Sequence, residues 1–146
     1  MPAIEMNELI QNGLNRAVEL MALAAYNSFR FGKRNTIKMV SLSIDDLKEI
    51  AEFCYSLGDM SPLAARDGRF LMELVKEPCA VLLIGDKRKS DFNYNCGACG
   101  YRTCAELNKA EEVEALTARG PSCQFKNLNI NIAAGAAAYI AGYSVR

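Results

Sequence analysis

Residues 95–104 read NCGACGYRTC, and this stretch decides how the C-terminal half of the chain must fold. It places Cys96, Cys99 and Cys104 close together, and Cys123 follows eighteen residues after Cys104. The spacing C-x2-C-x4-C-x18-C supplies four thiolates, which is the ligand number of a [4Fe-4S] cluster. The glycines within the stretch can adopt positive φ, as a tight loop around a cluster requires. We therefore expect a metal-binding loop over 94–124, flanked by regular elements.

Two helix starts are predicted beside this loop. The TCAE sequence has the pattern of a capping box, which puts Cys104 at the first helical position. Ser122 is the expected cap of a second helix, which would begin at Cys123 and carry Lys126 in its first turn. The N-terminus of a helix bears partial positive charge, which favours thiolates and an anionic cluster.

Other thiol chemistries remain open at this point. A structural zinc ion also takes four cysteines, although its ligands usually come as two close pairs. The cysteines would otherwise be oxidised or free of any ligand. The chain has no histidine, which excludes a mixed Cys-His zinc site and a Ser-His-Asp triad within one chain. No residue is assigned a catalytic role, and Cys54 and Cys79 are expected to be small buried apolar residues.

Length and composition indicate a single globular domain over residues 1–146. Just over half of the chain, 51%, is hydrophobic, and 17 basic residues balance 17 acidic ones. A chain without net charge has no overall field to attract nucleic acid or an anionic membrane. The N-terminus lacks the pattern of a signal peptide, and the most apolar stretch is too short for a confident membrane span. We expect a cytoplasmic protein, with reduced thiols and no membrane or nucleic-acid partner.

The hydrophobic periodicity predicts an α+β fold in which long amphipathic helices pack on a small sheet. Two strands are too few for a free-standing sheet, so either further strands lie in the predicted loops or a partner subunit covers the exposed surface. We therefore expect a homodimer, formed through the Gly- and Ala-rich last helix, which is itself predicted to be a buried packing helix. Helices are predicted over 5–27, 43–58, 61–77, 103–120 and 122–145, and strands over 36–43 and 79–85.

A basic turn follows the first predicted helix. Its candidate anion contacts are Arg30, Lys33 and Arg34, with Lys38 close behind. These side chains would receive a phosphate, a flavin or an acidic redox partner. The alternative is an ordinary solvated loop, which is the commoner role of short charged turns.

The cysteine stretch resembles a known iron-sulfur module. CGACGYRTC followed by GPSC is similar to the four-cysteine module found in one component of an electron-transport complex and in the corrinoid iron-sulfur protein. The whole chain resembles an uncharacterised ferredoxin-domain family, a domain of unknown function, in LMALAAYNS, SIDDLKEIAE, AVLLIG and GPSCQFKNLNINIAAGAAA. This resemblance implies a [4Fe-4S] cluster held by Cys96, Cys99, Cys104 and Cys123.

The layout also resembles the flavin-dependent nitroreductase fold, in a reduced form. That family carries an arginine-rich motif for the phosphate of FMN, and the corresponding MPAIEMNELI has no arginine. The leading prediction is a protein that passes single electrons from one [4Fe-4S] cluster to an unidentified redox partner. The alternatives are a flavin-linked oxidoreductase, with FMN near the basic turn or between subunits, and an interaction module held together by zinc.

Overall fold

A computed structural model describes residues 5–33, 36–116 and 118–144 of the chain. The chain divides into two compact units, each built from two stretches of sequence. The first unit takes the chain up to Glu19 and again from Val40 to Leu83. The second unit takes Leu20–Met39 and the chain from Ile84 onward. The single domain expected over residues 1–146 stays a prediction.

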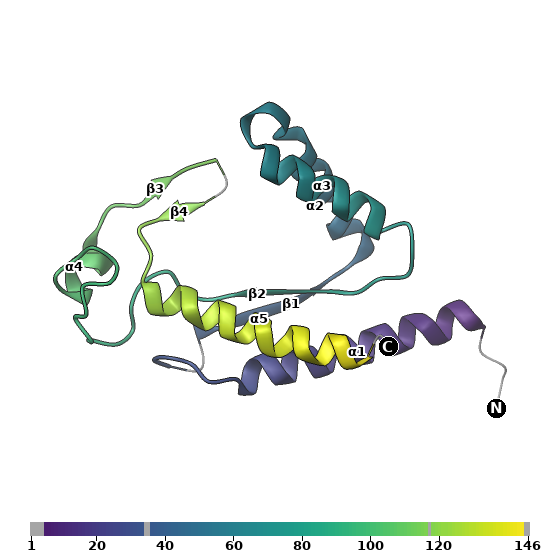
Figure 1. Ribbon diagram of the computed structural model, residues 1–146, viewed down its shortest axis with the longest axis horizontal. Helices are drawn as coiled ribbons and strands as arrows, with labels where there is room; N and C mark the ends of the chain where they lie inside the picture. The colour runs from purple at the N-terminus through teal and green to yellow at the C-terminus, as the bar shows by residue number, and fades with distance from the viewer. Residues whose placement is uncertain (1–4, 34–35, 117, 145–146) are drawn as a thin grey trace. The chain divides into compact units, whose positions relative to one another are not determined.

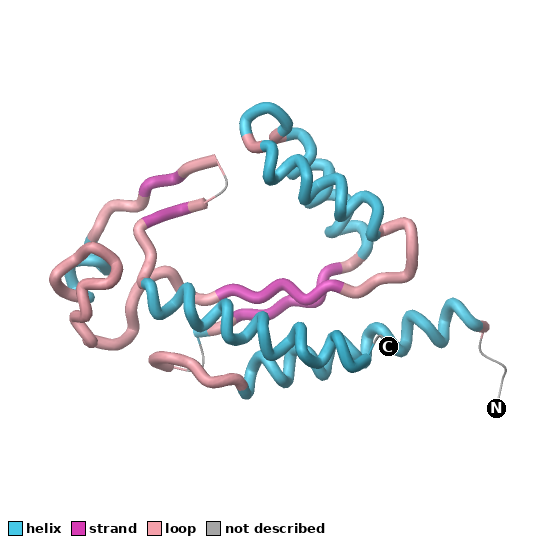
Figure 2. The backbone as a smooth tube through the Cα atoms, viewed as in Figure 1, coloured by secondary structure: helices cyan, strands magenta, loops and turns pink. Residues whose placement is uncertain are grey.

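The fold is α+β, as the sequence predicts (Figure 1). β1 and β2 are hydrogen-bonded to each other and form one two-stranded sheet (Figure 2). β3 and β4 form a second, antiparallel pair with Val113 opposite Gly120. The helices are α1 (Met6–Asn27), α2 (Ile44–Ser56), α3 (Pro62–Leu74), α4 (Cys104–Lys109) and α5 (Gln124–Ser144), and the strands are β1 (Lys38–Leu42), β2 (Val81–Gly85), β3 (Val113–Glu114) and β4 (Arg119–Gly120).

In the first unit, α2 and α3 form a close helical hairpin (Figure 1). Ser43 caps α2 through a complete capping box with Asp46, and Ser61 caps α3. Gly68 lets the two helices approach each other, because a Cβ atom on it would lie 2.8 Å from the carbonyl oxygen of Ala51. The helices predicted over 43–58 and 61–77 are confirmed.

In the second unit, α5 buries a single face. Lys126, Asn129, Ala133 and Ala137 are buried and recur every three or four residues. Tyr139 and Tyr143 are exposed, so the prediction of a buried packing helix holds for one face of α5 only. Within the part of the chain that the structure describes, no helix has the length and apolar character needed to cross a bilayer.

Two predictions about regular structure are wrong. The helix expected over 103–120 ends at Lys109, and the chain continues as the β3–β4 hairpin. Ion pairs of Arg119 with Glu114 and of Arg88 with Glu112 hold this hairpin, whereas a helix would crowd its glutamates together. Within the run 79–85, residues 81–85 form β2, but this strand is not buried as predicted, since Leu83 is exposed and the other strand residues are half-buried. A two-stranded sheet has only edge strands and cannot surround either of them.

Candidate metal centre

Four cysteines line one pocket in the second unit. These are the four predicted ligands, Cys96, Cys99, Cys104 and Cys123. The free space at its centre is small, about 10 Å³, which is room for about one water molecule. The pocket thus gathers thiols from the cysteine loop, the start of α4 and the residue before α5. The other lining residues are Phe92, Asn95, Gly97, Tyr101, Thr103, Gln124 and Phe125.

The cysteine loop forms a tight turn at its two glycines. Gly97 and Gly100 have φ of 74° and 84°, in the left-handed region that glycine adopts without strain. The amide of Gly100 donates a hydrogen bond to the carbonyl of Gly97 at 2.9 Å and closes the turn. Cys96 is exposed and Cys99 is half-buried. The loop therefore forms the open side of the pocket.

Cys104 is the first residue of α4, as predicted, and its thiol is buried. The Thr103 hydroxyl caps the helix by accepting a hydrogen bond from the Glu106 amide at 3.2 Å. The amide of Cys104 donates to Oδ1 of Asn95 at 2.9 Å, which ties the helix to the cysteine loop. Hydrogen bonds from the Ser90 side chain and then from the Asn95 amide lower the pKa of the Cys104 thiol, and burial opposes them. The surroundings of Cys104 thus favour the thiolate that binds metal.

Cys123 lies one residue before the position predicted for it. α5 begins at Gln124, and the carbonyl of Cys123 accepts the helical hydrogen bond from Asn127 at 3.2 Å. Cys123 is therefore the cap residue, and Ser122 is not. Two contacts account for this: the Cys123 amide donates to the carbonyl of the distant Arg88 at 2.9 Å, and the Ser122 hydroxyl pairs with the Asn127 side chain.

Both helix starts line the pocket, but the amides of their cysteines have other acceptors. The Cys104 amide bonds to Asn95 and the Cys123 amide bonds to Arg88. Both helix N-termini therefore lie at the pocket, as predicted for a cluster site, while the amides of Cys104 and Cys123 are bonded to other groups. Stabilisation of a bound anion would come from the partial charge of the longer helix, α5.

Aromatic rings form one wall of the pocket. Phe92 and Phe125 line it, with ring centroids 6.0 Å apart. Tyr94 packs against both rings, at 4.5 Å from Phe92 and 5.6 Å from Phe125. Tyr101 lines the pocket directly. Such a wall excludes water from one side of the four thiols.

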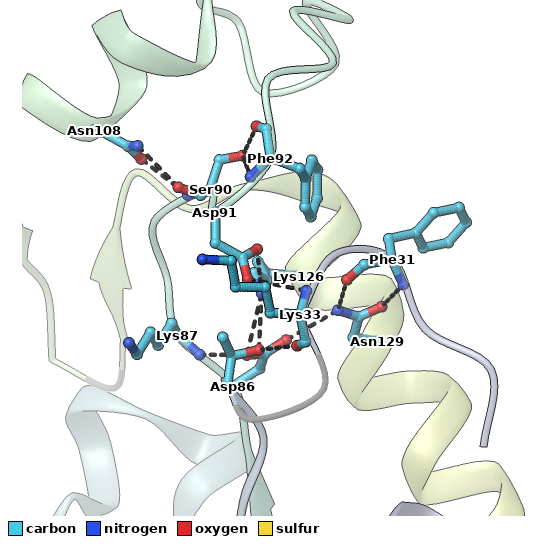
Figure 3. A network of polar contacts seen from close by, with 11 residues as sticks. Phe31, Lys33, Asp86, Lys87, Ser90, Asp91, Phe92, Asn108, Lys126 and Asn129 are labelled. Atoms are coloured by element: carbon cyan, nitrogen blue, oxygen red, sulfur yellow. Dashed lines mark hydrogen bonds and ion pairs between the residues drawn. The ribbon is translucent and has the colours of Figure 1, made fainter. Parts of the chain in front are cut away.

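A buried polar network, which the sequence pattern alone does not predict, lies beside this wall (Figure 3). Nζ of Lys126 lies 2.7 Å from the Asp91 carboxylate and 3.6 Å from that of Asp86, and it donates to the Thr36 hydroxyl at 2.9 Å. The Asn129 side chain bonds to both backbone polar groups of Phe31 and to Asp86. The sequence did carry a signal for the network, because Lys126 and Asn129 share the face of α5 that otherwise carries small apolar residues.

One residue of the basic turn has a structural role. The Arg30 side chain is buried and donates to the carbonyls of Ala25 and Tyr26 at the end of α1. Lys33 is exposed, and its amide donates to the Asp91 carboxylate at 3.1 Å. Arg34 lies outside the described residues. Anion binding by this turn stays a prediction, and for Arg30 the expectation of a solvated side chain is wrong.

The thiols of the pocket do not form a ready site for a single ion. Among the residues that the structure describes, no group of three or more His, Cys, Asp or Glu side chains is arranged to hold one metal ion. A single zinc would need every sulfur about 2.3 Å from one point. Cys54 and Cys79 belong to the first unit and do not line the pocket.

Comparison with known proteins gives one distant relative without an assigned function. An uncharacterised protein of Archaeoglobus fulgidus is 30% identical to this chain over 125 residues. The match covers 86% of this chain and 66% of that protein, so the chain spans just under two thirds of its relative. No protein-family model matches the chain. No solved structure matches it either.

Proposed function

We propose that the chain binds one [4Fe-4S] cluster through Cys96, Cys99, Cys104 and Cys123 and uses it to transfer single electrons. The observation that carries this proposal is the pocket lined by all four thiols. Of the residues that the structure describes, none in the lining carries a carboxylate, and the four cysteine sulfurs are its strong metal donors. A set of four soft thiolates suits iron-sulfur clusters and zinc, and does not suit magnesium or calcium.

The spacing of the cysteines along the chain favours a cluster over zinc. Structural zinc ligands usually come as two close pairs, whereas here Cys104 and Cys123 each stand alone in the sequence. A cubane takes one thiolate at each of four separate irons, so it does not require paired ligands. The residues present therefore fit the cluster by donor type and by number.

The pocket residues other than cysteine suit electron transfer. A bound cluster would supply the one-electron chemistry. The rings of Phe92 and Phe125 keep water from one side, which helps to set a reduction potential. Among the described residues, the lining contains no His, Asp, Glu or Lys, and Tyr101 is its one ionisable side chain other than the cysteines. The exposed side, at Cys96, is where a redox partner would approach.

The expected surroundings of the protein are part of this proposal. All six cysteines are free thiols in the structure, which is the state that the cytoplasm maintains. The redox partner is unidentified, and the resemblance to a ferredoxin-domain family remains a proposal as well. A flavin-linked oxidoreductase rests on resemblance alone, because no feature of the described residues favours FMN.

Anaerobic purification with single Cys→Ser variants tests the proposal. The wild-type protein should be brown, with broad absorption and bound iron and sulfide. Replacing Cys104 or Cys123 by serine should remove most of the colour and iron, because serine is a poor iron ligand. Cys54→Ser is the matched control and should keep both. A colourless zinc protein would support the structural alternative, yellow flavin bands would support the reductase, and a fully retained cluster in Cys123→Ser would refute the ligand set.

A further inference from the structure

One short segment, residues 86–92, contacts both elements that carry the isolated cysteines. The carbonyl of Arg88 accepts the hydrogen bond from the Cys123 amide at 2.9 Å. Two residues later, Ser90 and Asn108 of α4 exchange two hydrogen bonds through the Ser90 backbone, both of 2.9 Å (Figure 3). The relative placement of Cys104 and Cys123 therefore depends on where the 86–92 segment lies.

The 86–92 segment is held in turn by the buried ammonium group of Lys126. Lys126 belongs to the first turn of α5, and its side chain is 1% exposed. It pairs with Asp91 at 2.7 Å and with Asp86 at 3.6 Å, near the two ends of the segment. The Asp91 carboxylate also accepts a hydrogen bond from the Lys33 amide at 3.1 Å. Because a buried charge that loses its partner is strongly unfavourable, these contacts fix the segment against α5.

We propose that the Lys126–Asp91 pair is a positioning element of the metal centre, which holds Cys104 and Cys123 in place before the cluster binds. The inference rests on the proposed function for what binds there, but the positioning itself is a property of the metal-free protein. Cys104 and Cys123 are 6% and 4% exposed, whereas Cys96 is exposed. The pocket thus has a fixed half and an open half, and the cluster enters at the open half.

The same pair acts on the charge of the cluster. Nζ of Lys126 lies 5.7 Å from the centroid of the Phe92 ring, and Phe92 lines the pocket. Charges interact more strongly across an apolar wall than through water. Reduction of a bound cluster by the redox partner would add one electron, and so one negative charge, to the pocket. The ammonium of Lys126 favours this added negative charge, and the carboxylate of Asp91 opposes it.

Thiol labelling of the metal-free protein tests the positioning. N-ethylmaleimide is applied and the modified cysteines are located by peptide mass spectrometry. In wild type, Cys96 should react first, with Cys104 and Cys123 protected. In Asp91→Asn, the two protected thiols should react on the order of tenfold faster or more. Cys79, which is buried in the first unit, reports global unfolding and should stay protected.

Unchanged protection of Cys104 and Cys123 in Asp91→Asn would overturn the positioning role. If Asp91→Asn also exposes Cys79, the conservative variant Asp91→Glu decides the matter. The retained carboxylate must then restore protection of all three thiols, and failure to do so overturns the proposal.

Redox titration of the cluster-loaded protein, followed by EPR, tests the charge effect. Lys126→Met should shift the reduction potential to a more negative value, and Asp91→Asn should shift it to a more positive one. Lys48→Met, which removes an exposed charge from α2, should leave it unchanged. Loosening of the structure would not give shifts of opposite sign, so equal or absent shifts would overturn this role. Absence of iron and sulfide from wild type would instead refute the proposed function, and the labelling result would stand independently.

Discussion

The two glycines of the cysteine loop show how single residues determine the shape of the pocket. Both have positive φ, and a Cβ atom on Gly97 would meet no other atom within 4 Å. A side chain at this position is therefore opposed by backbone strain and not by crowding. Asn95, just before the first cysteine, also has a positive φ, of 49°, and its side chain accepts a hydrogen bond from the Cys104 amide. These residues together direct the loop back toward α4.

Gly97→Ala should destabilise the loop by about 1–2 kcal/mol, the approximate cost of a left-handed conformation for an L-residue. The expected result is faster loss of iron on exposure to a chelator, measured by the decay of the brown absorption. Gly135→Ala is the control, because Gly135 is an exposed helical residue with open space around it. It should leave iron retention unchanged and raise stability by about 0.5–1 kcal/mol. Equal retention in both variants would show that the loop conformation does not matter.

Among the elements, those with local signals could be predicted from the sequence and those held by distant contacts could not. Ser43 and Ser61 mark the starts of α2 and α3, because the side chain of each accepts a hydrogen bond from the backbone amide three positions later. The β3–β4 hairpin is invisible in the sequence, since it depends on partners such as Arg88, which precedes Glu112 by 24 residues. The start of α5 at Gln124 depends on Arg88 in the same way.

In the candidate site, too, features with a local sequence signal could be predicted and those held by distant contacts could not. The close spacing of its first three thiols predicted a shared site, and the structure brings Cys123 to the same pocket. The helical pattern places Lys126 on the small apolar face of α5, but its counterions could not be identified from the sequence, because Asp86 and Asp91 reach it from a different part of the chain. A lysine in a helical pattern is expected at the surface unless its counterions are known.

The cap of α2 gives a pH prediction. Hydrogen bonds from the Ser43 side chain and then from the Ser43 amide hold the pKa of Asp46 below its ordinary value of 3.8. A lowered carboxyl pKa stabilises the fold above the ordinary value, and this contribution is lost as the pH falls below it. Ser43→Ala should cost about 1 kcal/mol near neutral pH and should weaken the loss of stability in acid. Thermal unfolding between about pH 6 and about pH 3 measures both effects.

Ser56→Ala is the matched control for this prediction. Its hydroxyl donates to the carbonyl of Phe53 in the same helix and contacts no carboxylate. The pH dependence of its unfolding should follow wild type. An acid profile of Ser43→Ala that is identical to wild type would contradict the capping argument.

The predicted homodimer would form through the exposed face of α5. Ala138 is exposed, and next to it Tyr139 and Tyr143 are also exposed, with tilted rings whose centroids lie 4.9 Å apart. Small residues beside exposed aromatic rings form a surface against which a second helix can pack closely. The dimer stays a prediction until its mass in solution is measured.

Light scattering coupled to gel filtration should give about twice the 16.0 kDa mass of one chain. Ala138→Glu places a charge on the outer face of α5 and should shift the protein to the monomer. Asn12→Glu, the same charge at an exposed position on α1, should not. A wild-type protein that is monomeric at micromolar concentration would rule the dimer out.

We propose that the four thiols of one pocket hold an inorganic iron-sulfur cube. The decisive measurement is iron and acid-labile sulfide analysis of the anaerobically isolated protein, with EPR after chemical reduction. We expect about four irons and about four sulfides per chain, with a paramagnetic signal that appears on reduction. Stoichiometric zinc without sulfide, or a protein without bound metal, would contradict it.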